Sequence, residues 1–214
     1  HNLKAVALCC GILLTVLCAS PGPLLADYVI TGNDGTVART ADYWIQGDKL
    51  FLGDSAHSLD VYGIKTVTGE NLPQDTLEKK DELVQEMRKD MDDLLNREKE
   101  IMNAQSSVIT RITEPASGTV FDSKSRKSFL AEVEGNKGKL DALTGAWRRL
   151  RLPEFSLLRM RDVKMLQLMS LKTSMEQTVK FVKTGDPTYR ESARVQMGMA
   201  RSFDESFKTY LSGN

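Results

Sequence analysis

The hydrophobic pattern of this chain changes once, near Asn71, and this change constrains the fold more than any other feature. Before it, residues 28–68 hold short runs rich in β-branched and aromatic residues, separated by turn signals such as Asn33-Asp34-Gly35 and Gly47-Asp48. After it, apolar residues recur every three or four positions. The two patterns predict an α+β protein in which a small β module precedes a helical region.

The β module is predicted to span residues 27–70 and to close into a very small barrel. About five short strands fit into roughly forty residues, and a sheet that short has two exposed edges unless it closes on itself. The expected strands contain apolar residues at strand-like spacing, among them Val37, Tyr43, Ile45, Leu50 and Leu52.

The first helix is predicted over residues 73 to 112, a length of about 60 Å. Lys80, Glu98 and Gln105 interrupt its apolar stripe. A helix of this length either overhangs the bundle and carries the barrel, or bends near 103–107 and packs wholly inside the bundle. We favour a partial overhang.

Three further helices complete a predicted antiparallel four-helix bundle over residues 71–214. The second is expected to begin at Ser123 and to end at Pro153, and the third continues to Gly185. Asp186 as N-cap with Pro187 at the first helical position is a strong start signal for the fourth. The expected stripe of the third helix contains Leu157, Val163, Leu166, Met169, Met175, Val179 and Val182.

Residues 1–26 are typical of a secretory signal peptide rather than of folded structure. Lys4 precedes an apolar run, and Pro21-Gly22-Pro23 follows it shortly before the expected cleavage site at Ala26. The segment holds all three cysteines of the chain, so the mature protein would contain none. This pattern favours a periplasmic or secreted protein. The alternative is a membrane-anchored lipoprotein with a lipid attached at Cys18.

The charge balance gives no reason to expect nucleic acid as a partner. The chain carries 29 basic and 29 acidic residues, and loss of Lys4 with the leader leaves 28 against 29.

His57 would be the single histidine of the mature chain. We interpret it as an exposed turn residue, because one imidazole with Asp54 and Asp60 falls short of a closed metal site. No convergent catalytic set, haem site or di-iron motif can be assembled, so we expect neither an enzyme nor a cofactor.

Nine methionines lie downstream of the leader, and thioethers can bind Cu(I). Met87 with Met91, and Met165 with Met169, would each share a helix face. These positions also follow the apolar stripes, where methionine fills irregular gaps in a core. We expect core packing, with copper binding as the alternative.

The clearest charge cluster is the segment Trp147-Arg148-Arg149-Leu150-Arg151, joined by Arg159 and Arg161. Arginine beside tryptophan can hold a phosphate or carboxylate through its planar fork. The first helix is rich in acidic residues, and we expect the cluster to face them or to be solvated. Binding of an anionic envelope component or acidic partner is the alternative, with Trp147, Arg148, Arg149 and Arg151 as candidate contacts.

The stretch DYWIQGDKLFL, followed by SLDVYGIKTVTG, resembles the small SH3-like or Sm-like β module of exported bacterial proteins. The shared features are an aromatic strand with Trp44, a Gly-Asp turn, an apolar strand and a one-turn helix at Val61-Tyr62-Gly63. The resemblance covers about forty residues. It implies binding of a protein, a peptide or the cell envelope rather than catalysis, with Tyr43, Trp44 and Tyr62 as candidate contacts.

The sequence therefore predicts an exported, non-enzymatic binding or scaffold protein, in which the β module recognises a partner and the bundle positions it. The alternative is a bundle that binds a small molecule, either a lipid or copper, between its helices. A stripe left uncovered on a long overhanging helix could also pair two copies of the chain.

Overall fold

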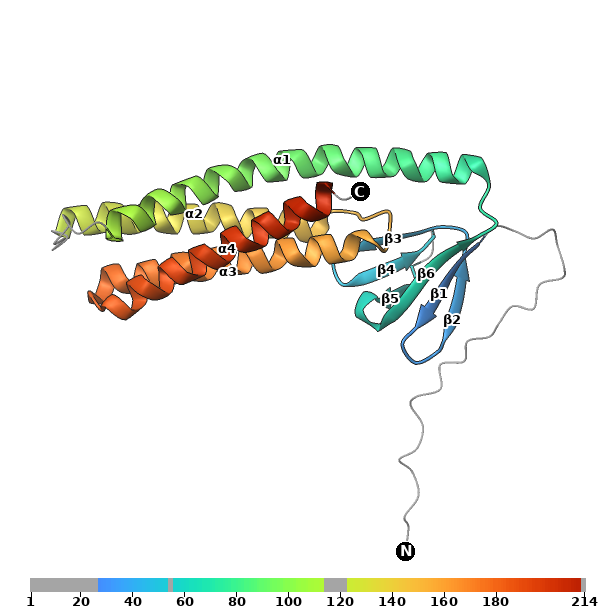
Figure 1. The fold of residues 1–214 in the computed structure, drawn as a ribbon, viewed down its shortest axis with the longest axis horizontal. Helices are drawn as coiled ribbons and strands as arrows, with labels where there is room; N and C mark the ends of the chain where they lie inside the picture. Colours follow the sequence, from blue (N-terminus) through green and yellow to red (C-terminus); the bar gives the residue numbers. More distant parts are fainter. Residues whose placement is uncertain (1–26, 54–55, 114–122, 213–214) are drawn as a thin grey trace, which may run out of the picture.

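The strands lie at one end of an elongated molecule, and four helices run along its length (Figure 1). The computed structural model describes residues 27–53, 56–113 and 123–212. The predicted leader, its cleavage site and Cys18 lie outside these residues. The part of the chain that is described is α+β, as predicted.

Six strands and one short 3-10 helix form the β module. In chain order they are β1 (Asp27–Gly32), β2 (Val37–Thr40), β3 (Tyr43–Gln46), β4 (Lys49–Leu52), β5 (Ser58–Asp60), η1 (Val61–Gly63) and β6 (Ile64–Glu70). The turn predictions at Asn33-Asp34-Gly35 and Gly47-Asp48 are confirmed, because they connect β1 to β2 and β3 to β4. Gly35 and Gly47 have φ of 84° and 61°, values that side chains disfavour. The one-turn helix predicted before the last strand is η1.

The predicted closure of these strands into one barrel is wrong. They form two antiparallel three-stranded sheets, with strand orders β2-β1-β6 and β3-β4-β5, and no pairing between the sheets occurs in the described chain. The edge that closure would have covered is paired in another way. The Ile45 amide donates to the Leu152 carbonyl at 2.9 Å, and the Leu152 amide returns a bond to Ile45 at 2.8 Å. A connection between two helices thus protects the free edge of β3.

Four packed helices follow, and each runs opposite to the one before it (Figure 1). They are α1 (Gln74–Thr113), α2 (Ser123–Arg149), α3 (Leu157–Thr184) and α4 (Pro187–Ser212). The start of α4 is as predicted, since the Asp186 carboxylate accepts from the Thr188 amide at 2.9 Å. Gly185 ends α3 with φ 75°.

The first helix is continuous over 40 residues, and the predicted overhang is confirmed. Its N-terminal part lies over the sheets (Figure 1). There the Lys80 ammonium lies 4.2 Å from the ring centre of Tyr28 and 3.8 Å from that of Tyr43. The two rings meet edge to face at 4.9 Å, so a single lysine joins α1 to both sheets.

The predicted apolar stripe of α3 is wrong in part. Leu166 and Met169 are exposed, whereas Arg161, Lys164 and Gln167 are buried. The buried face follows alternating spacings of four and three, and polar residues occupy some of its positions. It contains Arg161, Lys164, Leu168, Leu171, Met175, Thr178 and Val182. Lys164 and Thr178 are tolerated there because α1 supplies hydrogen-bond partners, Glu98 for Lys164 and Gln105 for Thr178.

Candidate functional site

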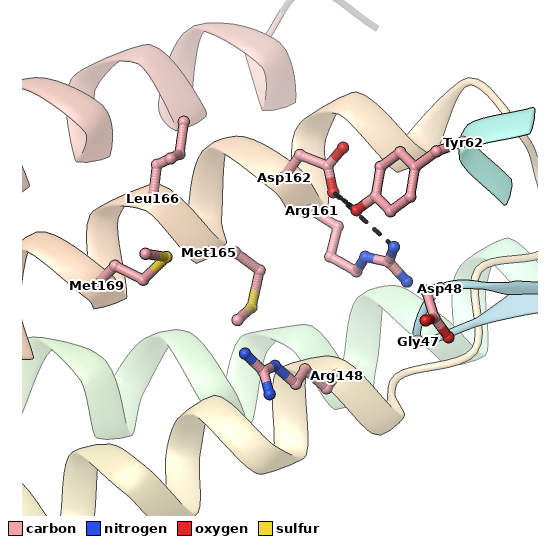
Figure 2. Close-up of a pocket in the computed structure, with 9 residues that line it drawn as sticks. All are labelled: Gly47, Asp48, Tyr62, Arg148, Arg161, Asp162, Met165, Leu166 and Met169. Atoms are coloured by element: carbon pink, nitrogen blue, oxygen red, sulfur yellow. Dashed lines mark hydrogen bonds and ion pairs between the residues drawn. The ribbon is translucent and has the colours of Figure 1, made fainter. Parts of the chain in front are cut away.

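A groove lies where the β module meets α2 and α3. We call it the junction groove. It has a volume of about 560 Å³. Its lining comes from the β3–β4 turn, η1, the C-terminal end of α2 and the first half of α3 (Figure 2). The residues are Gly47, Asp48, Tyr62, Arg148, Arg161, Asp162, Met165, Leu166 and Met169.

Backbone hydrogen bonds hold the walls of the groove together. The Gly47 amide donates to the Arg148 carbonyl at 3.0 Å and so fastens the β3–β4 turn to the end of α2. The Val61 amide donates to the Asp48 carbonyl at 2.9 Å. The Asp60 side chain caps η1 by accepting from the Tyr62 amide at 3.0 Å, which holds Tyr62 at the rim. Local turn chemistry and tertiary contacts therefore position this site together.

Arg161 is the most unusual residue of the groove, because its side chain is only 4% exposed and its charge is incompletely paired. Its Nη2 lies 3.8 Å from Asp162 Oδ1, while its Nη1 is buried without a hydrogen-bond partner. A buried guanidinium nitrogen with no acceptor carries a large desolvation cost. The guanidinium points from α3 toward the Gly47-Asp48 turn (Figure 2).

Asp162 is already engaged with the tyrosine at the rim. The Tyr62 hydroxyl donates to Asp162 Oδ1 at 3.3 Å. Partial burial raises the pKa of the Tyr62 hydroxyl, the nearby Asp162 carboxylate adds to the increase, and the Arg161 guanidinium opposes it. The tyrosine is therefore neutral at pH 7 and remains a hydrogen-bond donor.

Apolar side chains lie beside these charges and remain open to solvent. Tyr62 is 60% exposed, Leu166 46% and Met169 58%. Large apolar groups that gather around a concave surface are typical of interaction sites rather than of ordinary protein surface.

Only two of the seven predicted contact residues line the groove, namely Tyr62 and Arg148. Tyr43 and Trp147 are core residues. The Tyr43 hydroxyl accepts from the Phe155 amide at 3.0 Å, and the Trp147 ring packs edge to face on Phe207.

The remaining three predicted residues lie near the strand β3. The half-buried Trp44 stacks on Phe51, and the Arg151 guanidinium lies 4.8 Å from the Trp44 ring. Arg149 accepts a bond from the Gln46 side chain through its carbonyl at 2.9 Å. Pairing of Arg148, Arg149 or Arg151 with the acidic residues of α1 is not found among the described residues. The side chains of all three arginines are instead exposed.

The histidine and methionine candidates differ in outcome. His57 is exposed, whereas Asp54, its possible metal-binding neighbour, lies outside the described residues. The described residues include no group of three or more His, Cys, Asp and Glu side chains able to hold a metal. Core packing is right for Met87 and Met91 but wrong for Met169 and for Met199, which is 42% exposed.

From the sequence, Arg161 was assigned to the basic cluster but was not among the candidate contact residues. Arg161 and Lys164 precede Leu168 and Leu171 at spacings of three, four and three, which puts two cations on the buried face of a helix. Charged residues in that register are rarely buried unless they are paired. The spacing of Arg161 and Lys164 relative to these leucines was therefore the sequence signal that the two cations are buried.

Comparisons of the chain with protein-family models, with curated proteins and with solved structures found no match. Among the helices described, none is long and apolar enough to cross a lipid bilayer.

Proposed function

We propose that this is an exported, non-enzymatic binding protein whose junction groove holds a carboxylate-bearing peptide segment of a protein partner. Arg161 is the observation that carries the proposal. Its Nη1 is buried without an acceptor, and the residue lines a groove that is open to solvent. A carboxylate would satisfy that donor and complete the pairing of a charge that the fold has already desolvated.

The charges of the groove favour a single carboxylate over a polyanion. Arg148 and Arg161 are matched by Asp48 and Asp162, so the four groups together carry no net charge. A long anionic polymer would meet two carboxylates as well as two guanidinium groups. A peptide can instead bring one acidic side chain to Arg161 and keep its other residues neutral.

The exposed apolar side chains supply the second half of the recognition. Tyr62, Leu166 and Met169 offer one aromatic and two flexible aliphatic surfaces around the charged centre. Methionine adapts its shape to different neighbours, and aromatic residues are frequent anchors of protein interfaces. The expected partner segment therefore places a large apolar side chain beside its Asp or Glu.

The β module supports the same interpretation. Its two three-stranded sheets and the 3-10 turn before β6 fit the SH3-like architecture that the sequence resembles, without closure of the barrel. We infer that the module is SH3-like and that the bundle completes its binding surface, because α2 and α3 supply most of the groove. Export rests on the leader pattern of residues 1–26.

The test is a binding assay with defined peptides. Fluorescent six-residue peptides that combine one Asp or Glu with Leu and Phe are titrated against the protein, and matched peptides carry Asn or Gln. The acidic peptides should bind at least about 10-fold more tightly, since a charge-assisted hydrogen bond is worth about 1.5–3 kcal/mol. Equal binding of the amide peptides, or no binding of any peptide, would overturn the proposal.

Substitutions place the binding in the groove. Arg161→Leu should abolish the preference for acidic peptides, and Arg161→Lys should restore only part of it because lysine lacks the fork. Met169→Ala should weaken binding, whereas Met199→Ala, which removes an exposed methionine from α4, should not. If Met199→Ala weakens binding as much as Met169→Ala does, the peptide binds elsewhere.

A further inference from the structure

A second cavity lies between α1 and α4, and it is separate from the junction groove. We call it the bundle cavity. Its volume is about 630 Å³, within the range of small-molecule sites. Its lining includes four apolar residues and two acids. These residues are Leu95, Glu98, Met102, Asp204, Phe207 and Leu211.

Glu98 gives this cavity a built polar centre. The residue is 3% exposed, and its Oε1 accepts from Lys164 Nζ at 2.9 Å and from Gln167 Nε2 at 2.5 Å. Its Oε2 is buried without a hydrogen-bond partner. A carboxylate oxygen in that position costs free energy unless a donor reaches it. The one free acceptor of the buried cluster thus belongs to a residue of the cavity wall.

The free oxygen of Glu98 favours a ligand that donates a hydrogen bond. Lys164 lies between two carboxylates, because its Nζ is also 3.5 Å from Asp204 Oδ1. Lys208 reaches Asp204 Oδ2 at 2.8 Å but shares its ammonium with Glu205. These five groups comprise three carboxylates and two ammonium groups. Glu98 Oε2 is the carboxylate oxygen that is buried without a donor.

A metal ion fits this centre poorly. Lys164 Nζ is bound to the same carboxylate, and its positive charge would repel a divalent cation at Oε2. An organic ammonium carries a single charge and donates hydrogen bonds, so it fits one free carboxylate oxygen.

The rim sets the chemistry at the other end of the ligand. Lys99, Arg201 and Lys208 line the cavity and are exposed, so a second positive charge on the ligand would be repelled. A carboxylate would be attracted. Met102 and Phe207 also line the cavity and supply apolar surface.

We propose that the bundle cavity binds a small aliphatic zwitterion, with its primary ammonium on Glu98 Oε2 and its carboxylate at the lysine and arginine rim. The aliphatic chain lies along Met102 and Phe207. This site does not depend on the function proposed for the junction groove.

Three six-carbon probes test the proposal on the protein by isothermal titration calorimetry. They are 6-aminohexanoate, hexylamine and hexanoate. The zwitterion should bind, hexylamine should bind at least about 3-fold more weakly, and hexanoate should show no binding because it lacks the donor. Hexanoate or hexylamine binding as tightly as 6-aminohexanoate, or no binding of the zwitterion, overturns the proposal.

Two variants locate the site. Glu98→Gln places an amide where Oε2 was and should reduce the affinity for 6-aminohexanoate at least about 10-fold, while Glu100→Gln on the exposed face of α1 should not. Met102→Trp adds bulk to the cavity and leaves the residues of the buried cluster unchanged, so it should abolish binding even if Glu98→Gln fails to fold. Unchanged affinity in Met102→Trp refutes the site. Arg161→Leu should leave this affinity intact, which separates the test from that of the junction groove.

Discussion

The β module and the helical bundle each bury a lysine, but they do so in different ways. At the β module, Lys80 lies between the rings of Tyr28 and Tyr43, and its ammonium has no hydrogen-bond partner. In the bundle, Lys164 is fully buried and bonded to Glu98 and to Gln167. Aromatic faces are the partners of the first charge. The second also lies 3.9 Å from the centre of the Phe207 ring, but carboxylate and amide oxygens accept its hydrogen bonds.

The difference determines what each charge contributes to the fold. Burial lowers the pKa of Lys80 to about 8, although Asp42 and Glu154 oppose the effect from a distance. That lysine can lose its charge without leaving a carboxylate unpaired. Burial instead raises the pKa of Glu98, and the bond from Lys164 acts against this increase. Loss of the Lys164 charge would therefore leave buried carboxylates without their cation, whereas loss of the Lys80 charge would not.

Lys164→Met should have the largest effect on stability. It leaves the Glu98 and Asp204 carboxylates in the bundle without their shared cation, and breaking a buried pair from one side costs about 3–5 kcal/mol. Urea unfolding followed by helical circular dichroism measures the loss. Lys172→Met is the matched control on α3, because its exposed pair with Asp141 is worth about 0–1 kcal/mol. Equal losses in the two variants would contradict the comparison.

Lys80→Met should have a smaller effect and the opposite sign. A pKa of about 8 against the ordinary 10.5 means that the folded state disfavours the ammonium by about 3 kcal/mol at neutral pH. Methionine keeps the contact with the two rings and carries no charge. We expect a gain of about 1–3 kcal/mol at pH 7, while Lys79→Met, at the exposed neighbouring position, should change little.

The pH dependence of stability sharpens the Lys80 prediction. Above about pH 8 the folded chain releases the Lys80 proton, whereas the unfolded chain keeps it until about 10.5, so the free energy of unfolding should rise with pH. The rise from pH 7 to 9.5 should be about 2 kcal/mol in the wild type and absent in Lys80→Met. Burial raises the pKa of Tyr43 to about 12, which reverses the trend above pH 10. A wild-type curve that falls from pH 8 to 9.5 would contradict this assignment.

The features that could be predicted from the sequence are those set by neighbouring residues. Asp186 and Pro187 start α4 through a cap that spans two positions, and Gly47 turns the β3–β4 hairpin through its own φ. The partner of the β3 edge could not be predicted in this way. Its partner is Leu152, and no local pattern indicates that a connection between helices will pair with a strand.

The candidate site was less accessible to sequence reasoning for the same reason. Tyr62 and Asp162, which touch at the groove, lie 100 positions apart. Lys164 is separated from Glu98 by 66 positions. In the sequence, Glu98 is visible only as an interruption of an apolar stripe. Its place in a buried network depends on Lys164, and the sequence does not show that the two residues meet.

Gln105, the third polar interruption of α1, offers the smallest expected effect. It is fully buried, and its Nε2 donates to Ser174 Oγ and to Thr178 Oγ1, both at 3.2 Å. Both hydroxyls donate elsewhere, Ser174 to the Ala193 carbonyl and Thr178 to the Ser174 carbonyl. Gln105→Met would therefore remove the two hydrogen bonds that these hydroxyls accept. Both hydroxyl protons would keep their own acceptors.

The net change for Gln105→Met should stay within about 1 kcal/mol. Each lost hydrogen bond costs about 0.5–1.5 kcal/mol, but Gln105 Oε1 is itself buried without a partner, and its removal relieves a cost of about 1–3 kcal/mol. Urea unfolding beside Gln85→Met, an exposed glutamine of the same helix, measures the difference. A loss above about 2 kcal/mol would show that neutral polar contacts bind these helices as strongly as a charge does. The contrast between charged and uncharged burial in this bundle would then fail.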